Sequence, residues 1–269
     1  MNKEIENRFL KHFESIKESS LNDKTIYKFE GDEFVDEDIF NNENSKDTSL
    51  HLDLLPQPFV GDVKNAKIII CSLNPGFDKE NYNDEEYIKE HIKEQFSQDE
   101  HPSMFWLEND ENIKNTGGAK WWRGKLNQKN KTASLVYNIA QEYNKENPDE
   151  KIEAVFEWLS KNMAAIELFP YHSKSFKKSL TNCKSTRIIR DYVHELIKNE
   201  ENDKKLICFT RSFNLWGKDG KSVSDIADGK YVICAGSPRC VTFNVTKDLG
   251  KRILEYIGEL TSDFKEPLN

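Results

Sequence analysis

An asparagine follows directly after the most apolar run of the chain, and this placement favours a ligand site. Residues 67–73 read KIIICSL, and Asn74, Pro75 and Gly76 come next. In an open α/β sheet, ligands bind just beyond the carboxyl ends of the strands. Asn74 would deliver a hydrogen-bond donor and an acceptor to that position, while Pro75 and Gly76 fix the backbone around it. An ordinary strand-to-helix turn can have the same tripeptide and is the alternative.

A second apolar run, at residues 163–169, carries an acidic residue and leads into a tyrosine and a histidine. Glu167 lies inside this run, where an unpaired carboxylate would be costly, so it either contacts a ligand or pairs with a nearby Lys or Arg. Tyr171 and His172 come just past the run, on the side where a ligand is expected. His172 could act as an acid, a base or a hydrogen-bond donor, although a histidine in a loop can also simply be solvated.

The stretch from Tyr171 to Arg190 is basic. It contains six Lys and Arg residues, no Asp or Glu, and several interleaved Ser and Thr residues. Phosphate contacts combine cations with hydroxyl and backbone donors, so this composition indicates a site for a nucleic-acid backbone, with Lys174, Lys177 and Lys178 as candidates. A solvated helix face explains the stretch almost as well.

Two glycine-containing segments add candidate contacts for a nucleic acid. Residues 235–240 read AGSPRC, a tight loop in which Ser237 and Pro238 precede Arg239, whose cation could meet a phosphate or enter a groove. A turn with an exposed arginine is the alternative. Residues 117–124 read GGAKWWRG, a combination that suits base stacking on a flexible loop. The two tryptophans can equally be one core residue and a partly covered neighbour.

Short apolar runs alternate with helical patterns along the chain, which predicts a mainly parallel sheet with helices on both faces. Continuous apolar runs are typical of strands that are buried on both sides. We therefore expect a three-layer α/β/α fold with a four-stranded central sheet and a helical insertion at about 78–150. The predicted strands are 67–73, 163–169, 204–210 and 230–235, and the predicted helices are 82–96, 132–146, 151–161, 186–199, 222–227 and 246–259.

The first 50 residues differ in composition from the rest of the chain. Residues 1–20 carry apolar side chains at helical spacing, whereas residues 21–50 are acidic, rich in Asn and weakly patterned. This predicts a helix followed by a loop or arm. We expect the segment 1–50 to be distinct from an α/β domain at 51–269, and its acidic arm is a candidate binding site for a protein partner.

Charge is unevenly distributed along the chain. The formal net charge is −8 over 269 residues, yet residues 113–269 hold 27 bases and 20 acids, a local excess of +7. A basic C-terminal portion permits a polyanionic partner such as DNA although the total charge is acidic. Mixed charge is also normal on any protein surface.

Several common chemistries lack their motifs here. The chain has no Walker A, GxGxxG or GxSxG pattern, and its five cysteines stand singly without metal-ligand spacing. These absences argue against P-loop hydrolysis, Rossmann redox chemistry, zinc catalysis and α/β-hydrolase chemistry, so we expect no metal and no organic cofactor. No apolar run reaches the roughly 20 residues of a membrane span, and the charged N-terminus lacks a signal sequence. The sequence therefore predicts a cytoplasmic protein without membrane contact.

Taken in order, these segments resemble the uracil-DNA glycosylase superfamily, in particular its single-strand-selective and mismatch-specific branches. Residues 56–61 (PQPFVG) and 72–76 (SLNPG) are similar to the family's first motif. The Asn of that motif positions the attacking water, a role that would fall on Asn74. Phe77 would correspond to a residue that helps to wall the base pocket. Residues 237–239 (SPR) are similar to the end of the last motif, His-Pro-Ser-Pro-Arg, whose loop enters the DNA.

Two departures from the family pattern bear on the substrate. Ala235 takes the place of the family's His, which stabilises the leaving uracil anion, and Glu167 takes the place of the Asn that reads the uracil edge. An ionised Glu only accepts hydrogen bonds, whereas Asn also donates, so Glu167 would fit a base that presents N–H groups. The resemblance covers about residues 56–257, with the insertion and the first 50 residues unmatched.

The resemblance implies a divergent member of this superfamily, a DNA glycosylase-like DNA-repair hydrolase that acts on a flipped-out or single-stranded base other than ordinary uracil. Asn74 and His172 would be catalytic. A module of the same fold that binds a nucleic acid or nucleobase without cutting it is one alternative, and a protein-interaction or inhibitor module is another. The candidate substrate-binding residues are Pro75, Gly76, Phe77, Glu167, Tyr171, Ser237, Pro238 and Arg239.

Overall fold

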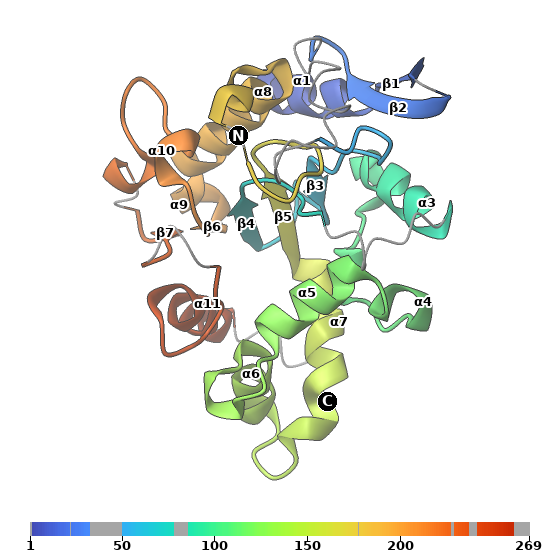
Figure 1. The fold of residues 1–269 in the computed structure, drawn as a ribbon. Helices are drawn as coiled ribbons and strands as arrows, with labels where there is room; N and C mark the ends of the chain where they lie inside the picture. The colour runs from blue at the N-terminus through green and yellow to red at the C-terminus, as the bar shows by residue number, and fades with distance from the viewer. Residues whose placement is uncertain are drawn as a thin grey trace.

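The strands form a five-stranded sheet and a separate two-stranded sheet (Figure 1). The structure, a computed structural model, describes residues 2–21, 23–32, 50–77, 86–176, 178–226, 229–236 and 241–260. The strands of the larger sheet are β3 (Phe59–Val60), β4 (Ile68–Ser72), β5 (Met163–Glu167), β6 (Leu206–Phe209) and β7 (Val232–Cys234). Their order is β3-β5-β4-β6-β7, with β3 antiparallel to β5 and all other neighbours parallel. The chain is therefore a mixed α/β protein with a mostly parallel larger sheet.

The four apolar runs predicted as strands are β4, β5, β6 and β7, each shortened at one or both ends. Every residue of β4 is buried, in keeping with a strand that is covered on both faces. The fifth strand, β3, is not predicted from the sequence because it contains only Phe59 and Val60, which pair with Ile166 and Ala165. Two residues that follow a proline-containing lead-in are too few to show any periodicity.

Helices cover both faces of the larger sheet. Figure 1 shows α1 (Lys3–Phe13) and α8 (Lys184–Lys198) above the sheet, and α7 (Ile152–Asn162) and α11 (Asp248–Glu259) below it. The predicted helices 151–161, 186–199 and 246–259 correspond to α7, α8 and α11 with small shifts at their ends. In α8 the buried side chains recur at helical spacing, so one stripe of the helix packs inward.

The N-terminal segment is shorter as a helix than predicted and continues as a hairpin. α1 ends at Phe13, and the two-stranded sheet follows, with β1 (Ile16–Leu21) antiparallel to β2 (Lys24–Phe29). The helix predicted over 1–20 and the unstructured arm predicted from residue 21 are therefore wrong over this hairpin. Residues 33–49, the rest of the predicted acidic arm, lie outside the described residues.

This N-terminal segment shares its hydrophobic core with the larger sheet. Phe9 of α1 stacks on Tyr192 of α8, with ring centroids 4.0 Å apart, and lies 5.3 Å from the ring of Phe59. Phe13 and Phe29 are also buried, in edge contact with one another. The packing therefore continues across residue 50, where the sequence predicts a boundary.

The predicted insertion is helical. It contains α3 (Glu86–Gln95), α4 (Glu111–Lys114), α5 (Gly117–Leu126) and α6 (Leu135–Tyr143). The predicted helices 82–96 and 132–146 correspond to α3 and α6. α5 is unexpected, since its glycines indicated a flexible loop. Thr116 caps it by accepting a hydrogen bond from the Ala119 N–H, and Gly118 lets the Trp106 ring approach to within 2.8 Å of where a Cβ would stand.

The remaining helices are short. They are α9 (Glu200–Asp203) and α10 (Phe213–Trp216), and the helix predicted at 222–227 is a 3-10 turn over Val223–Asp225. None of the helices in the described ranges combines the length and the apolar composition needed to cross a membrane. The thiols of Cys71, Cys183 and Cys208 are free and buried.

Candidate functional site

The parallel strands bring the main candidate residues to one edge of the sheet. β4 leads into Asn74, β5 ends at Glu167, and Arg211 follows β6 after a single residue. In the register of the sheet, Ser72 of β4 lies beside Glu167. Because β4 and β5 are parallel neighbours, Asn74 and Glu167 belong to adjacent strand ends on the edge where α/β proteins bind ligands.

Asn74 is buried and firmly held by the loop after β5. Its Nδ2 atom donates to the backbone oxygen of Ser173 at 3.0 Å, to the Ser173 hydroxyl at 3.1 Å and to the oxygen of Pro75 at 3.2 Å. These contacts place the nitrogen side of the amide against Ser173 and direct the Oδ1 atom to the opposite side. An acceptor fixed in this way is suited to orienting a water molecule.

His172 is a structural residue here and not an exposed acid or base. It is 2% exposed, and its Nδ1 and Nε2 atoms lie 3.0 Å from the backbone oxygens of Gly76 and Leu55. Burial lowers the pKa of His172 to about 4 despite these carbonyl contacts, so the ring is neutral at pH 7. A neutral imidazole carries one N–H, so it donates to one of the two carbonyls at a time. The ring joins the lead-in segment to the Asn-Pro-Gly turn, and the catalytic role expected of His172 stays a prediction.

Tyr171 also points away from the predicted base pocket. Its hydroxyl donates to Asp32 Oδ2 at 2.8 Å and accepts from the backbone N–H of Phe29 at 2.9 Å, and the side chain is 1% exposed. Asp32 is fully buried and also accepts from the backbone N–H and hydroxyl of Ser185 at the start of α8. Tyr171 therefore fastens the N-terminal hairpin to the core, and its expected role in lining a base pocket stays a prediction.

The residues after Asn74 form a partly exposed wall. Pro75 is buried, Gly76 is exposed, and Phe77 is half-buried. The ring of Phe77 stacks on His51, with centroids 3.4 Å apart and planes 17° from parallel. One face of the Phe77 ring is therefore covered by His51. The expected contact of Phe77 with a base stays a prediction.

Glu167 is a half-buried residue with one enclosed carboxyl oxygen. Among the described residues its Oε2 atom is buried without any hydrogen-bond partner, and the same is true of Arg211 Nε. Burial raises the pKa of Glu167 to about 8, although the positive charge of Arg211 works in the opposite direction. At pH 7 most of this carboxyl is consequently protonated, and it can donate a hydrogen bond as well as accept one.

Sequence reasoning missed two residues of this edge. Arg211 is the first charged side chain after β6, and the same rule that singled out the ends of the other strands applies to it. Ser173 is one of several serines in the basic stretch, and its contact with Asn74 joins residues 99 positions apart. The position of Arg211 was a usable signal, whereas the contact of Ser173 was not visible in the sequence.

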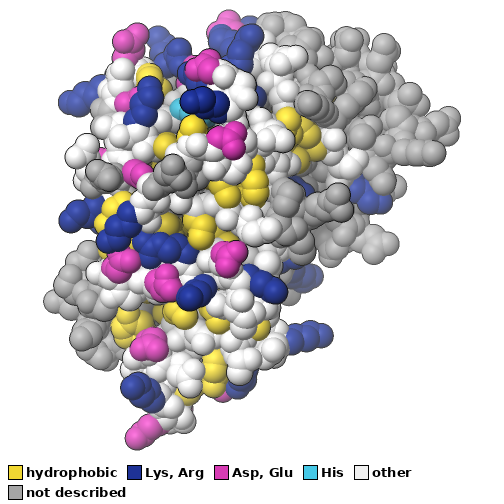
Figure 2. Space-filling model, turned by 90° about the vertical axis from the view of Figure 1, so that its left-hand side faces the viewer, with side chains coloured by type: hydrophobic (Ala, Val, Ile, Leu, Met, Phe, Trp, Pro, Cys, Tyr) yellow, Lys and Arg dark blue, Asp and Glu magenta, His cyan; other side chains and the backbone are white. Residues whose placement is uncertain are grey.

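The remaining nucleic-acid candidates are only partly described. Ser237, Pro238, Arg239 and Lys177 lie outside the described residues, and the side chain of Lys178 is likewise not described. Lys174 is exposed. Figure 2 shows the face formed by α10, β7 and α11, on which basic and acidic side chains are interleaved.

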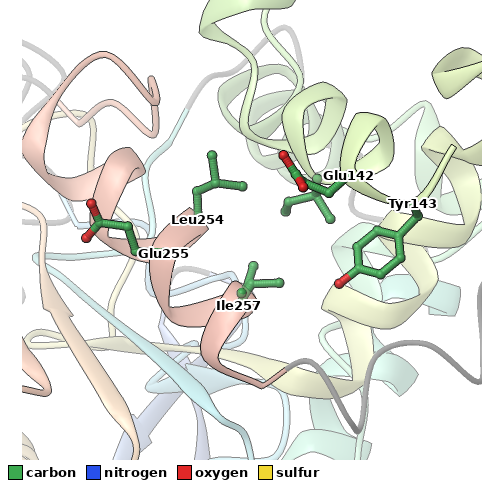
Figure 3. Close-up of a pocket in the computed structure, with 7 residues that line it drawn as sticks. Glu142, Tyr143, Leu254, Glu255 and Ile257 are labelled. Atoms are coloured by element: carbon green, nitrogen blue, oxygen red, sulfur yellow. The ribbon is translucent and has the colours of Figure 1, made fainter. Parts of the chain in front are cut away.

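A distinct pocket of about 440 Å³ lies between α6 and α11, away from the strand-end residues (Figure 3). Leu254 and Ile257 of α11 supply apolar surface, and Glu142 and Glu255 stand at its sides. None of the predicted site residues lines this pocket. In the described part of the chain, no three His, Cys, Asp or Glu side chains are grouped as metal ligands would be.

No protein family model, curated protein or solved structure matches this chain. The resemblance to uracil-DNA glycosylases therefore depends on the motif residues themselves, of which Asn74 and Glu167 lie at neighbouring strand ends.

Proposed function

We propose that this chain is a DNA glycosylase-like protein that receives a flipped-out or single-stranded base at the carboxyl edge of its larger sheet. The observation that carries the proposal is the placement of Asn74 and Glu167 at the ends of the neighbouring strands β4 and β5, where Glu167 Oε2 is buried without a partner among the described residues. A buried polar atom of this kind is costly unless a ligand completes its hydrogen bonding. The proposal includes a three-layer α/β/α domain with the strand order β5-β4-β6-β7, to which β3 is an addition.

Hydrolysis of an N-glycosidic bond requires a water oxygen to bond to the sugar C1′ carbon while the bond from C1′ to the base nitrogen breaks. Asn74, fixed by Ser173, orients that water through its Oδ1 atom. The electron pair of the broken bond leaves with the base, which then needs a hydrogen-bond donor or a proton. Ala235 offers no such side-chain donor.

Glu167 supplies the missing donor in this proposal. Its raised pKa keeps the carboxyl protonated at neutral pH, so it can donate to an oxygen or ring nitrogen of the leaving base. The cation of Arg211 stabilises the negative charge that develops there. A protonated carboxyl presents both a donor and an acceptor, so the preference expected from an ionised Glu167 no longer applies at pH 7. The expectation of a base other than uracil then depends on Ala235.

The second candidate is a module of the same fold that binds a base without excising it. A specific observation favours it: His172, the other candidate acid, is locked between two backbone carbonyls and neutral at pH 7. If Glu167 only reads the base edge, no described side chain at this edge is left to protonate a leaving base.

Oligonucleotides that carry one of a panel of normal and damaged bases distinguish these functions. Excision is scored as abasic sites by alkaline strand cleavage, and binding is measured with the same oligonucleotides by fluorescence anisotropy. Release of any base that is lost in Asn74→Ala supports the glycosylase proposal. Base-dependent binding without release supports the second candidate, and the absence of both overturns the two proposals together.

A further inference from the structure

Helix α5 carries two adjacent tryptophans, of which Trp121 is exposed and Trp122 is buried. Trp121 is 41% exposed and is the one large hydrophobic side chain in the described ranges that is exposed to this degree. The adjacent Trp122 is 6% exposed and stacks towards Phe243, with ring centroids 6.1 Å apart. Trp122 therefore anchors the helix to the core, while the Trp121 indole, in edge contact with Trp122, is partly exposed.

Three lysines close to Trp121 in the sequence form no ion pair with any described acid. Residues 113–141 contain six bases and no acid. Lys114, Arg123 and Lys131 form ion pairs with acids from outside this stretch. The other three, Lys120, Lys125 and Lys129, form no ion pair within the described part of the chain, and the Nζ atom of Lys125 lies 5.7 Å from the Trp121 ring centroid. Lys120 precedes Trp121 in α5 and Lys129 follows the end of the helix; Trp121, Lys120, Lys125 and Lys129 together are called the α5 surface below.

The chain that leaves the last strand-end loop runs along α5. Gln128 Nε2 donates to the Thr242 hydroxyl at 3.4 Å, and the Val245 N–H donates to the oxygen of Ala133 at 3.1 Å. Together with the contact between Trp122 and Phe243, these bonds place residues 241–245 against α5 and the turn that follows it. The segment 241–245 therefore joins the Trp122 side of α5 to the part of the chain that follows β7 in the sequence.

We propose that the α5 surface binds single-stranded DNA that flanks the base held at the sheet edge, an inference that rests on the proposed function for its location. An unpaired base can stack its face on the Trp121 indole, whereas the bases of an intact duplex are already stacked on one another. Lys120, Lys125 and Lys129 contact the phosphates on either side. The lack of acids over residues 113–141 gives the charge complementarity that a polyanion requires.

The test measures binding of a fluorescein-labelled 20-nucleotide single strand to the full chain at several salt concentrations. Trp121→Ala should weaken binding about 10-fold or more, because stacking of a base on an aromatic ring is lost, while Trp121→Phe should retain part of the affinity. Substitution of Lys120, Lys125 and Lys129 by Gln should lower the slope of log binding constant against log salt concentration by about 2 in magnitude. Each phosphate contact on a single strand contributes about 0.7 to that slope. Lys161→Gln is the matched control, because Lys161 is 65% exposed but pairs with Glu157.

The outcomes separate this inference from the proposed function. Unchanged binding in Trp121→Ala, with the thermal unfolding midpoint of the variant unaltered, overturns the α5 surface even if bases are still excised. If Trp121→Ala loses binding but the wild type releases no base from any oligonucleotide, the inference that the α5 surface binds single-stranded DNA is supported. The proposed glycosylase activity is then rejected. Binding to vesicles of anionic lipid in place of the single strand, with the same dependence on Trp121, also overturns the inference.

Discussion

The side-chain amide of Asn74 donates to the backbone oxygen of Ser173 at 3.0 Å, which joins the end of β4 to the loop after β5. The preceding residue of that loop, His172, contacts the oxygen of Gly76 on the other side of the same turn. Two consecutive loop residues thus hold the Asn-Pro-Gly turn from both ends. The loop after β5 consequently supports Asn74 through contacts of Ser173 and His172 with the turn.

Replacement of His172 by Ala should destabilise the fold by about 2–4 kcal/mol, because it leaves a cavity and removes a hydrogen bond to a buried carbonyl. Urea unfolding of the purified chain measures this loss. His172→Asn should restore part of the stability, since its amide can still donate to one carbonyl. If His172 were an acid or base, activity would fall far more than stability, and the pH profile of the remaining activity would change.

The stability of the fold should also depend on pH through the protonation of His172. The pKa of His172 in the folded chain is lowered to about 4, whereas its ordinary value is 6.5, so the unfolded chain binds an extra proton between these values. The contribution of this group to stability therefore rises from pH 4 to pH 6.5 and is constant above. The difference in unfolding midpoint between the wild type and His172→Asn should shrink as the pH falls through this window. A difference that does not depend on pH would contradict the assignment of a buried neutral ring.

Tyr171→Phe should cost about 1–3 kcal/mol and leave base and DNA binding unchanged. The substitution removes one of the donors to buried Asp32, which keeps its two bonds from Ser185, and it leaves the buried N–H of Phe29 without the hydroxyl that accepts from it. Thermal or urea unfolding reports the loss, with an exposed substitution such as Lys161→Gln as control. A selective loss of base binding at unchanged stability would instead indicate that Tyr171 lines a base pocket.

The strands that carry the site could be predicted from the sequence, because each is a continuous apolar run that needs no knowledge of its neighbours. β4 and β5 lie where KIIICSL and MAAIELF predict them, so the positions of Asn74 and Glu167 at strand ends followed directly. The directions of the side chains did not follow. Tyr171 turns towards Asp32, a residue 139 positions earlier, and the sequence contains no signal for that contact.

The N-terminal hairpin shows a second limit of sequence reasoning. Ile16 fits the helical spacing of α1, yet it begins β1 and pairs with Phe29. The local pattern favours a longer helix, and the tertiary contacts of Phe13 and Phe29 with the core override it. The protonation of Glu167 is a similar case, since it arises from burial by residues that the sequence does not place around it.

Glu167→Gln should remove a pH dependence from both stability and base recognition. The folded pKa of Glu167 is raised to about 8 from an ordinary value of 4.5, so the folded chain holds a proton that the unfolded chain has lost in this window. Stability should therefore decrease in the wild type as the pH rises from about 4.5 to 8, and the variant should lack that component. Unfolding midpoints measured for both proteins at pH 5, 7 and 9 test this, and parallel curves would contradict it.

Asn74→Asp should abolish function with little change in shape. The new carboxylate matches the amide in size but cannot donate to the backbone oxygen of Ser173, so the side chain loses the bond that fixes it. If a base is excised, the rate should fall by roughly 10²–10³-fold, the usual cost of losing one positioned polar group in a reaction of this kind.

Ser173→Ala is the matched control for Asn74→Asp. It removes the hydroxyl that lies 3.1 Å from Asn74 Nδ2 but keeps the backbone oxygen that accepts at 3.0 Å. Excision in this variant should stay within about threefold of the wild type, because the backbone contact still orients the amide. Single-turnover rates of abasic-site formation measure both variants, and anisotropy measures their binding. If Asn74→Asp excises as fast as Ser173→Ala, Asn74 does not orient the water, and the chemistry at this sheet edge must be assigned to other residues.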